Sequence, residues 1–359
     1  MTGKDSESSM TIRYARPVFY ARQWHFLMRN LVAIAVVFAF HSTLPAGAQT
    51  ALTILHTSEH HGTIQPIDQG AFTGQGGVER RASLVKQIRK EVEHLLVVDS
   101  GDLLMGTTLS SVYRGEADIA AMNLMGYDAV AVGNHDFDFG TQHLKGLHKA
   151  ATFPFLCSNV RPQEPDTCTR YIIKTLGALR IGLIALIGRN NYPDTFNRAV
   201  VREVEFQDPI AAAKKAVAEL RDHVDLLVAI THQDTEEDLA LAKGVPALDV
   251  IIGGHTEGFD GLVPPGTTAP AQGRVELAGV GPVFVKTHRQ GRTLGRLDLV
   301  LHDKTVMVAE ARNLPVTPTV PPDPEVAKLV QEYVQRLGRQ TTPRLDEATQ
   351  TDKPTPNAR

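Results

Sequence analysis

Short apolar runs typical of β-strands alternate with helical patterns along most of this chain, and this alternation is what most limits its fold. The strand candidates are residues 51–57, 95–99, 128–132, 153–157, 180–187, 225–231, 249–253, 282–287, 295–302 and 305–310. Residues 77–93 and 209–222 have helical patterns; the second begins with proline and is rich in alanine. The alternation predicts an α/β layered domain over residues 50–312. The last strands follow one another without helices, so part of the sheet is expected to be antiparallel.

Five of these strands end in a short polar cluster made of residue types that bind metal ions. In chain order the clusters are Glu59-His60-His61, Gly101-Asp102, Gly133-Asn134-His135-Asp136, Thr231-His232 and Gly253-Gly254-His255-Thr256-Glu257. In α/β sheets the loops beyond the carboxyl ends of the strands form the binding crevice. We therefore expect these distant segments to converge on one polar centre.

A two-metal hydrolytic site is the chemistry that this set of side chains would serve. Such a site needs a bridging carboxylate, further His, Asp, Asn or Glu ligands, and an open face where bound water ionises near neutral pH. The candidate ligands are Glu59, His61, Asp102, Asn134, His232, His255 and Glu257. Each residue alone is also explained as a buried histidine or a turn-forming side chain. Their joint occurrence predicts a metal centre.

The N-terminal residues 1–48 have the parts of a secretory signal peptide. Residues 1–30 hold five basic and two acidic side chains, and the apolar run LVAIAVVFAF and the small residues Ala46-Gly47-Ala48 follow. A membrane-spanning helix needs about 20 apolar residues, so no stable span is expected after cleavage; an uncleaved anchor is the alternative. Residues 1–27 fit a mis-assigned start. The pattern predicts a periplasmic or secreted protein.

The net charge limits the partners that the chain after the predicted signal peptide could bind. The whole chain has a formal charge of −3 and residues 1–30 carry +3, which leaves −6 for the rest. Without a basic stripe, this charge argues against a groove for a nucleic-acid duplex.

Cys157 and Cys168 are the only cysteines in the sequence. An oxidising compartment allows them to form a disulfide, and two free thiols are the alternative.

The composition changes after residue 312. Residues 313–339 hold the proline-rich stretch LPVTPTVPPDP, which predicts an extended connector, and then a final amphipathic helix. Asp323 is the expected N-cap, Pro324 fits the first turn, and the apolar stripe of the helix ends at Gly338. We expect the stripe to pack on the parent domain, with a partner-binding helix as the alternative. The polar residues 340–359 are predicted to be a disordered tail.

The polar clusters with their strands resemble one enzyme family. The blocks ILHTSEHHG, VVDSGDLLMG, VAVGNHDFDFG, AITHQD and IIGGHTE, in this order, are similar to the secreted 5′-nucleotidase and UDP-sugar hydrolase branch of the calcineurin-like metallophosphoesterases. The likeness covers about residues 51–312. It implies a four-layer αββα sandwich of two mixed sheets flanked by helices, with two divalent metal ions at the strand ends.

The resemblance also implies a role for each ligand. The first metal would be held by Glu59, His61, Asp102 and Glu257, and the second by Asp102, Asn134, His232 and His255. Asp102 would bridge, and a hydroxide between the metals would attack phosphorus. His135 matches the family's catalytic histidine, which contacts the phosphoryl group, and Asp138 would orient it. Asn134 would also contact substrate.

Two ligands depart from the family pattern, because Glu59 stands where Asp is usual and Glu257 where His or Gln is usual. Both belong to the first metal, which would then have three carboxylates and one imidazole. Oxygen-rich sites favour Mn²⁺, with Mg²⁺ and Ca²⁺ also suited, over Zn²⁺ or Fe. The alternative is that this metal binds weakly and the chain is a weakened metal-binding or partner-binding protein.

The expected substrate is a small phosphate ester of nucleotide type, and an ester of another anion is the further alternative. The resemblance implies that two-domain relatives bind the nucleoside with a C-terminal domain, for which we expect no counterpart in this sequence. The resemblance thus implies an exposed, unselective site or one completed by another chain. Tyr192, Phe196 and Phe259 lie next to ligand clusters in the sequence and are candidates to line the pocket; packing against the domain is the alternative.

Overall fold

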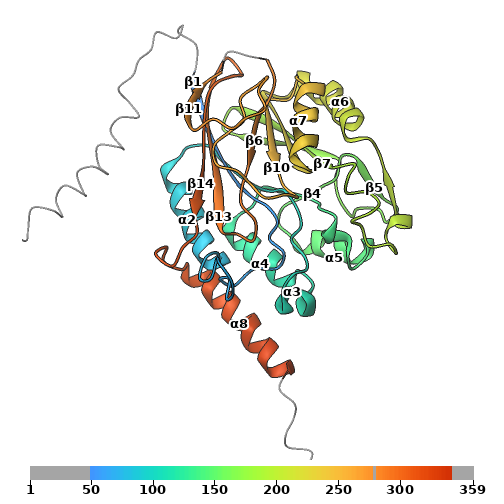
Figure 1. The fold of residues 1–359 in the computed structure, drawn as a ribbon, viewed down its shortest axis with the longest axis vertical. Helices are drawn as coiled ribbons and strands as arrows, with labels where there is room; N and C mark the ends of the chain where they lie inside the picture. Colours follow the sequence, from blue (N-terminus) through green and yellow to red (C-terminus); the bar gives the residue numbers. More distant parts are fainter. Residues whose placement is uncertain (1–48, 278–279, 342–359) are drawn as a thin grey trace, which may run out of the picture. The chain divides into compact units, whose positions relative to one another are not determined.

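The structure is a computed structural model that describes residues 49–277 and 280–341. The predicted signal peptide, residues 1–48, and residues 342–359 of the predicted tail lie outside the described residues. The described part contains two large mixed sheets with helices on their outer faces, as Figure 1 shows. This is the α/β architecture expected from the sequence.

The first sheet has seven strands in the order β11-β14-β13-β1-β2-β3-β4. In chain order its strands are β1 (Gln49–Thr57), β2 (Leu95–Asp99), β3 (Ala129–Ala131), β4 (Phe155–Leu156), β11 (Gly273–Glu276), β13 (Thr293–His302) and β14 (Thr305–Pro315). Strands β1 to β4 are parallel, so their carboxyl ends lie at one edge of the sheet. Strands β13, β14 and β11 complete the sheet by antiparallel pairing, as the sequence predicted.

The second sheet has five strands in the order β12-β10-β9-β7-β6. They are β6 (Tyr171–Leu176), β7 (Leu179–Ile187), β9 (Leu226–His232), β10 (Val250–Gly253) and β12 (Val283–Lys286). Strands β7, β9, β10 and β12 are parallel, and β6 pairs with β7 as an antiparallel hairpin. A separate two-stranded sheet joins β5 (Val160–Pro162) to β8 (Val204–Phe206).

The two large sheets share an apolar core, because alternate side chains of each strand point to opposite faces. In β2, Leu96 and Val98 join the core shared with the second sheet, whereas Leu95 and Val97 face the helices outside the first. Strand β9 divides in the same way, with Val228 directed to the shared core and its neighbours to the helices of the second sheet. Both sheets are therefore covered on both faces.

Helices form the two outer layers. Those that share the apolar cluster outside the first sheet are α2 (Val78–Glu91), α3 (Thr108–Tyr113), α4 (Glu116–Met125), α5 (Thr141–Ala150) and α8 (Pro324–Thr341), and α8 packs on α2, α3 and α4. Those packed on the second sheet are α6 (Pro209–Leu220) and α7 (Thr235–Gly244). Short 3₁₀ turns are η2 (His135–Phe137), η3 (Val201–Glu203) and η4 (Arg221–His223). The order helices, sheet, sheet, helices confirms the four-layer αββα fold.

Four strands were not predicted. Strands β5, β8 and β11 are only three or four residues long, and β11 is mostly exposed, so none of them carries an apolar run. Strand β6 is only partly buried and ends in a tight turn at Gly177. Strand β14 also continues to Pro315, beyond the expected boundary. Proline is tolerated there because it stands at the last pair of the ladder, opposite Thr293.

Helix α8 packs on the domain, as its apolar stripe predicted. Asp323 caps it, since its Oδ1 accepts a hydrogen bond from Val326 N at 3.1 Å. Val326 is fully buried, and Tyr333 meets the Tyr113 ring edge-to-face at 4.9 Å. The helix runs to Thr341, past the end expected at Gly338.

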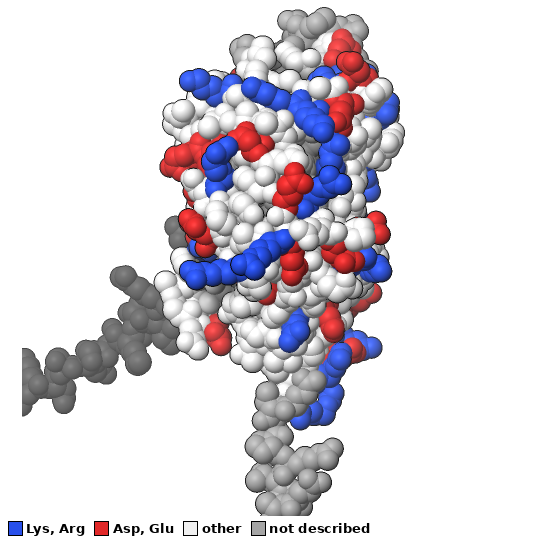
Figure 2. Space-filling view, turned by 90° about the vertical axis from the view of Figure 1, so that its right-hand side faces the viewer, with Lys and Arg blue, Asp and Glu red and all other residues white. Residues whose placement is uncertain are grey.

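Cys157 and Cys168 form a disulfide, which resolves the alternative left open by the sequence. Within residues 49–277 and 280–341, no helix combines the length and apolar character needed to cross a membrane. On the face drawn in Figure 2, basic and acidic side chains are interspersed and neither sign covers the face.

Candidate metal centre

The loops after β1, β2, β3, β9 and β10 meet at one place. The backbone connects the first two, because Glu59 N donates to Gly101 O at 3.0 Å and His61 N to Asp102 O at 2.9 Å. His232 joins them by a hydrogen bond between its Nδ1 and Ser100 O at 2.8 Å. The structure thus brings together segments that are far apart in the chain.

Four side chains of this centre stand on backbone of left-handed conformation. The φ angles are 52° for Glu59, 48° for His61, 59° for Asp102 and 68° for His255. Residues with a Cβ rarely adopt this region, at a cost of about 1–2 kcal/mol each. Non-glycine residues held there cluster at functional sites, where the surrounding structure imposes the geometry. This observation points to the same loops as the sequence clusters do.

Asp136 connects the β2 and β3 loops. Its carboxylate accepts backbone hydrogen bonds from Leu103 N and Gly133 N at 2.8 Å and from Asp102 N at 3.0 Å. Burial and the neighbouring Asp102 raise the pKa of Asp136 to about 7, although the N–H donors of Gly133 and Leu103 and the nearby His232 favour the charged form. In return, Asp102 Oδ1 accepts from His135 N at 2.8 Å. These bonds fix the carboxylate of Asp102 relative to His135.

Gly133 is required by close packing at this junction. A Cβ at this position would lie 2.3 Å from Asp102 Oδ1 and 2.6 Å from Asp102 N. We expect Gly133→Ala to lower the free energy of unfolding by about 1–3 kcal/mol through overpacking and to weaken metal binding. Denaturant unfolding and Mn²⁺ titration measure the two effects.

Gly146→Ala is the matched control for this substitution. Gly146 lies inside helix α5, and a Cβ there meets no heavy atom within 4 Å. Gly146→Ala should raise the free energy of unfolding by about 0.5–1 kcal/mol, because alanine is a better helix former than glycine. Equal effects of the two variants would show that packing against Asp102 is unimportant.

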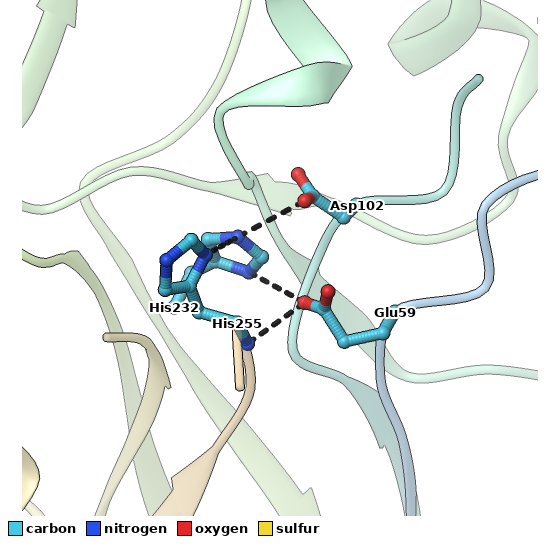
Figure 3. A group of neighbouring side chains, drawn as sticks. All are labelled: Glu59, Asp102, His232 and His255. Carbon is cyan, nitrogen blue, oxygen red and sulfur yellow. Dashed lines mark hydrogen bonds and ion pairs between the residues drawn. The ribbon is translucent and has the colours of Figure 1, made fainter. Parts of the chain in front are cut away.

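Three candidate ligand atoms surround a fourth, His232 Nε2. This nitrogen lies 3.0 Å from Asn134 Oδ1, 3.3 Å from Asp102 Oδ2 and 3.3 Å from His255 Nδ1. Ligand atoms that each lie about 2.1 Å from one ion are about 3.0–3.4 Å apart. Figure 3 shows the two imidazoles side by side and facing the carboxylates of Asp102 and Glu59. The spacing therefore suits a single divalent cation.

Neighbouring groups orient these atoms. The Ser100 carbonyl accepts from His232 Nδ1–H, which leaves the lone pair of Nε2 for an ion. Asn134 Nδ2 donates to Thr195 O at 3.3 Å, which turns its Oδ1 toward His232. The carboxylate, amide oxygen and two imidazoles form a mixed oxygen and nitrogen set that several divalent ions accept.

The carboxylates of Asp102 and Glu59 act on the charge of His232. Burial opposes a charge on His232, yet the carboxylates of Asp102 and Glu59 outweigh it and raise the pKa of His232 to about 10. Burial likewise opposes ionisation of Asp102, but His232 above all holds the pKa of Asp102 well below its usual range. The two carboxylates beside His232 favour positive charge at this point, and the converging oxygen and nitrogen donors fit a divalent ion.

The ligands predicted for the first metal are only partly brought together. Glu59 Oε2 lies 3.1 Å from His61 Nε2, which lies 3.9 Å from Asp102 Oδ2. The guanidinium of Arg289 lies beside them, with Nη2 3.2 Å from His61 Nε2 and 3.3 Å from Glu59 Oε2. An arginine thus lies beside Glu59 and His61, two of the ligands predicted for the first metal.

Glu257 is not brought into this group. Its carboxylate accepts hydrogen bonds from Arg292 Nη2 at 2.6 and 2.7 Å, and its Oε1 lies 2.7 Å from His288 Nδ1. Burial opposes its charge, but His288 and Arg292 hold the pKa of Glu257 below its usual range. Arg292 is nearly buried and requires a counter-charge, which explains why Glu257 turns toward it.

His135 and Asp138 form a pair at the mouth of the centre. His135 Nδ1 lies 2.7 Å from Asp138 Oδ2, and this hydrogen bond raises the pKa of His135. The His135 side chain is 39% exposed, so solutes reach it. Its ring meets that of His61 at 5.4 Å. His60, by contrast, points away and pairs with Asp118 Oδ1 at 2.9 Å.

The three candidate pocket aromatics pack against the domain. Phe196 is buried and stacks on Phe137, and Tyr192 stacks on Phe206 at 4.8 Å. Phe259 meets Phe284 at 5.3 Å. These contacts account for the rings without a ligand, as the packing alternative proposed.

Sequence reasoning missed the cationic side of the centre. Buried Lys286 donates to Thr256 Oγ1 at 2.6 Å and to Gln233 O at 3.2 Å, and so connects the loops that carry His255 and His232. Lys286 ends β12, and Arg289 and Arg292 follow it. The signal was present, because this polar segment follows a predicted strand in the same way as the five clusters do. It was passed over because lysine and arginine do not ligate metals.

The chain is similar in sequence to known proteins. A family model described as calcineurin-like phosphoesterase matches residues 52–257. The chain is 32% identical to snake venom 5′-nucleotidase of Gloydius brevicauda over 301 residues, covering 79% of this chain and 50% of that protein. It is 30% identical to the 5′-nucleotidase of Bos taurus over 322 residues, covering 84% and 55%.

A solved structure agrees with these relatives. The crystal structure of a 5′-nucleotidase precursor from Thermus thermophilus matches with a TM-score of 0.70 at 30% identity, covering 81% of this chain and 59% of that one. The chain spans about half the length of the curated relatives it matches.

Proposed function

Because this chain belongs to the calcineurin-like phosphoesterase family, we propose that it is a metal-dependent hydrolase of small phosphate esters of nucleotide type. The observation that carries the proposal is the convergence of Asp102, Asn134 and His255 on His232, with the His135–Asp138 pair beside them. The nucleotide class is supported by similarity to proteins named 5′-nucleotidase.

The proposed ion would be held by Asp102 Oδ2, Asn134 Oδ1, His232 Nε2 and His255 Nδ1. When bound, a divalent cation lowers the pKa of water and neutralises charge on phosphoryl oxygens. Several divalent ions accept these two oxygen and two nitrogen donors, and Mn²⁺ is the one that we propose to test first.

His135 would act on the phosphate itself. The hydrogen bond from Nδ1 to Asp138 fixes the ring and leaves Nε2 to donate a hydrogen bond to a phosphoryl or leaving oxygen. The raised pKa of His135 favours the protonated form that such donation needs. Asp138 is then a positioning residue, because it acts through the histidine.

Hydrolysis assays test the proposal. After treatment with EDTA, the full chain should be inactive, and added Mn²⁺ should restore release of phosphate from AMP and from 4-nitrophenyl phosphate. The diester bis(4-nitrophenyl) phosphate is the comparison for substrate class, and we expect it to react more slowly. Absence of turnover with every substrate and every divalent ion would refute the proposed activity.

We also propose that the chain works in an oxidising compartment, periplasmic or extracellular. The Cys157–Cys168 disulfide supports this location, because such bonds persist outside the reducing cytosol. The similarity to a snake venom protein is compatible with export.

A further inference from the structure

We infer that the guanidinium of Arg289 replaces one of the two expected metal ions, so that the chain holds a single divalent cation. The cation site is the one formed by Asp102, Asn134, His232 and His255. The inference rests on the metal centre proposed above. It concerns the number of ions bound.

The donor atoms of the first predicted site are already engaged. His61 Nε2 has either one proton or one lone pair. When protonated it donates to Glu59 Oε2 at 3.1 Å, and when neutral at this atom it accepts from Arg289 Nη2 at 3.2 Å. In the first state Nε2 has no lone pair, and in the second its lone pair faces the Arg289 guanidinium, which an ion would have to displace. The same arginine nitrogen lies 3.3 Å from Glu59 Oε2, so the positive charge stands among the donors that the ion would need.

The carboxylate of Glu59 also has a structural task. Its Oε1 accepts a hydrogen bond from His255 N at 2.7 Å and lies 3.5 Å from His232 Nδ1. Glu59 therefore joins the loop after β1 to the loops of the second sheet. With Arg289 on one oxygen and the His255 backbone on the other, both oxygens of this buried carboxylate have partners.

The backbone holds Arg289 in place. The residue after it, Gln290, donates its backbone N–H to Glu59 O at 2.8 Å. Arg292 Nε donates to Arg289 O at 3.1 Å. Arg292 in turn binds both oxygens of Glu257, the fourth predicted ligand of the first metal. One short segment thus supplies a cation to Glu59 and removes Glu257 from the centre.

An arginine differs from a metal ion in what it offers a substrate. Its charge is permanent and its planar donors suit phosphate oxygens. The Arg289 side chain is 41% exposed, so it is accessible to solutes at the mouth of the centre. We expect it to bind the phosphate group of the substrate without activating water.

Metal stoichiometry decides the inference. The EDTA-treated full chain is titrated with Mn²⁺ by calorimetry, and bound ions are counted by elemental analysis and electron paramagnetic resonance. The native chain should bind one ion with the spectrum of an isolated Mn²⁺. Arg289→Ala should bind two, the second more weakly, with a spectrum of two coupled ions.

Arg170→Ala is the control, because Arg170 is similarly exposed and pairs with Glu219 at 2.6 Å. It should bind one ion. Two ions on the native chain would overturn the inference and leave the proposed function intact, and one ion on both native and Arg289→Ala chains would overturn the role of the arginine. Failure of the native chain to bind any ion would overturn the inference and the proposed metal dependence together.

Discussion

Replacing Asp102 by asparagine should remove most metal binding and most activity. Asp102 is buried, its Oδ2 faces His232 Nε2 at 3.3 Å, and its negative charge offsets the cation. Loss of groups that merely support a ligand costs about 10–100-fold in affinity, so losing this carboxylate should cost at least about 100-fold. Turnover should fall by about 10³-fold or more, the upper range for one electrostatic group.

Asparagine is the informative substitution because it keeps the backbone. Asp102 has a φ of 59°, and asparagine adopts this left-handed region more readily than most residues. Mn²⁺ calorimetry and kcat/KM for AMP measure the two losses. Asp128→Asn is the control, since Asp128 accepts from Val97 N at 2.8 Å and pairs with Lys174 away from the centre. Unchanged Mn²⁺ affinity in Asp102→Asn would contradict the assigned site.

Replacing His135 by alanine should lower kcat by about 10²–10⁴-fold, the usual contribution of a proton-donating side chain. Metal content should not change, because His135 contacts Asp102 through its backbone N, at 2.8 Å, and this bond survives the substitution. Asp138→Asn should have a smaller effect of about 10–100-fold, as expected for a residue that orients another. A change in the pH profile of kcat separates this orienting role from a purely structural one.

His143→Ala is the control for His135→Ala, because His143 is a partly buried histidine of helix α5 whose Nε2 lies 2.7 Å from Arg114 O. Its activity should equal that of the native chain. If His135→Ala lost metal along with activity, His135 would be part of the metal site. If it kept full kcat, the proposed mechanism would be wrong.

The fold was predictable from the sequence because strand and loop patterns are local. The apolar runs that became β1, β2 and β9 alternate between two buried faces, and a predicted ligand stands at the end of each strand or within three residues after it. The rule that parallel strands meet at one edge of a sheet then placed Asp102 beside Asn134, because they follow the neighbouring strands β2 and β3. The approach of His232 depends in addition on how the second sheet packs on the first. The short strands β5, β8 and β11 carried no such run, so they were found only in the structure.

The ion pair or covalent bond that each side chain forms was less predictable. Glu257 follows closely after His255 and has a metal-binding carboxylate, yet it pairs with Arg292. That choice depends on how deeply Arg292 is buried, which is a tertiary property. The pairing of Cys157 with Cys168 was open for the same reason, since the sequence does not state the distance between two loops. Arg289 was overlooked because it is not a ligand type.

The ligands of the proposed ion come from both halves of the sandwich. Asp102 and Asn134 follow strands β2 and β3 of the seven-stranded sheet, whereas His232 and His255 belong to the ends of β9 and β10 in the five-stranded sheet. A bound ion would therefore be a non-covalent cross-link between the sheets. A ligand at about one hundred times its Kd adds about 2.7 kcal/mol to the stability of the state that binds it. Scarcity of the ion would then limit how long each folded molecule survives, as well as how fast it works.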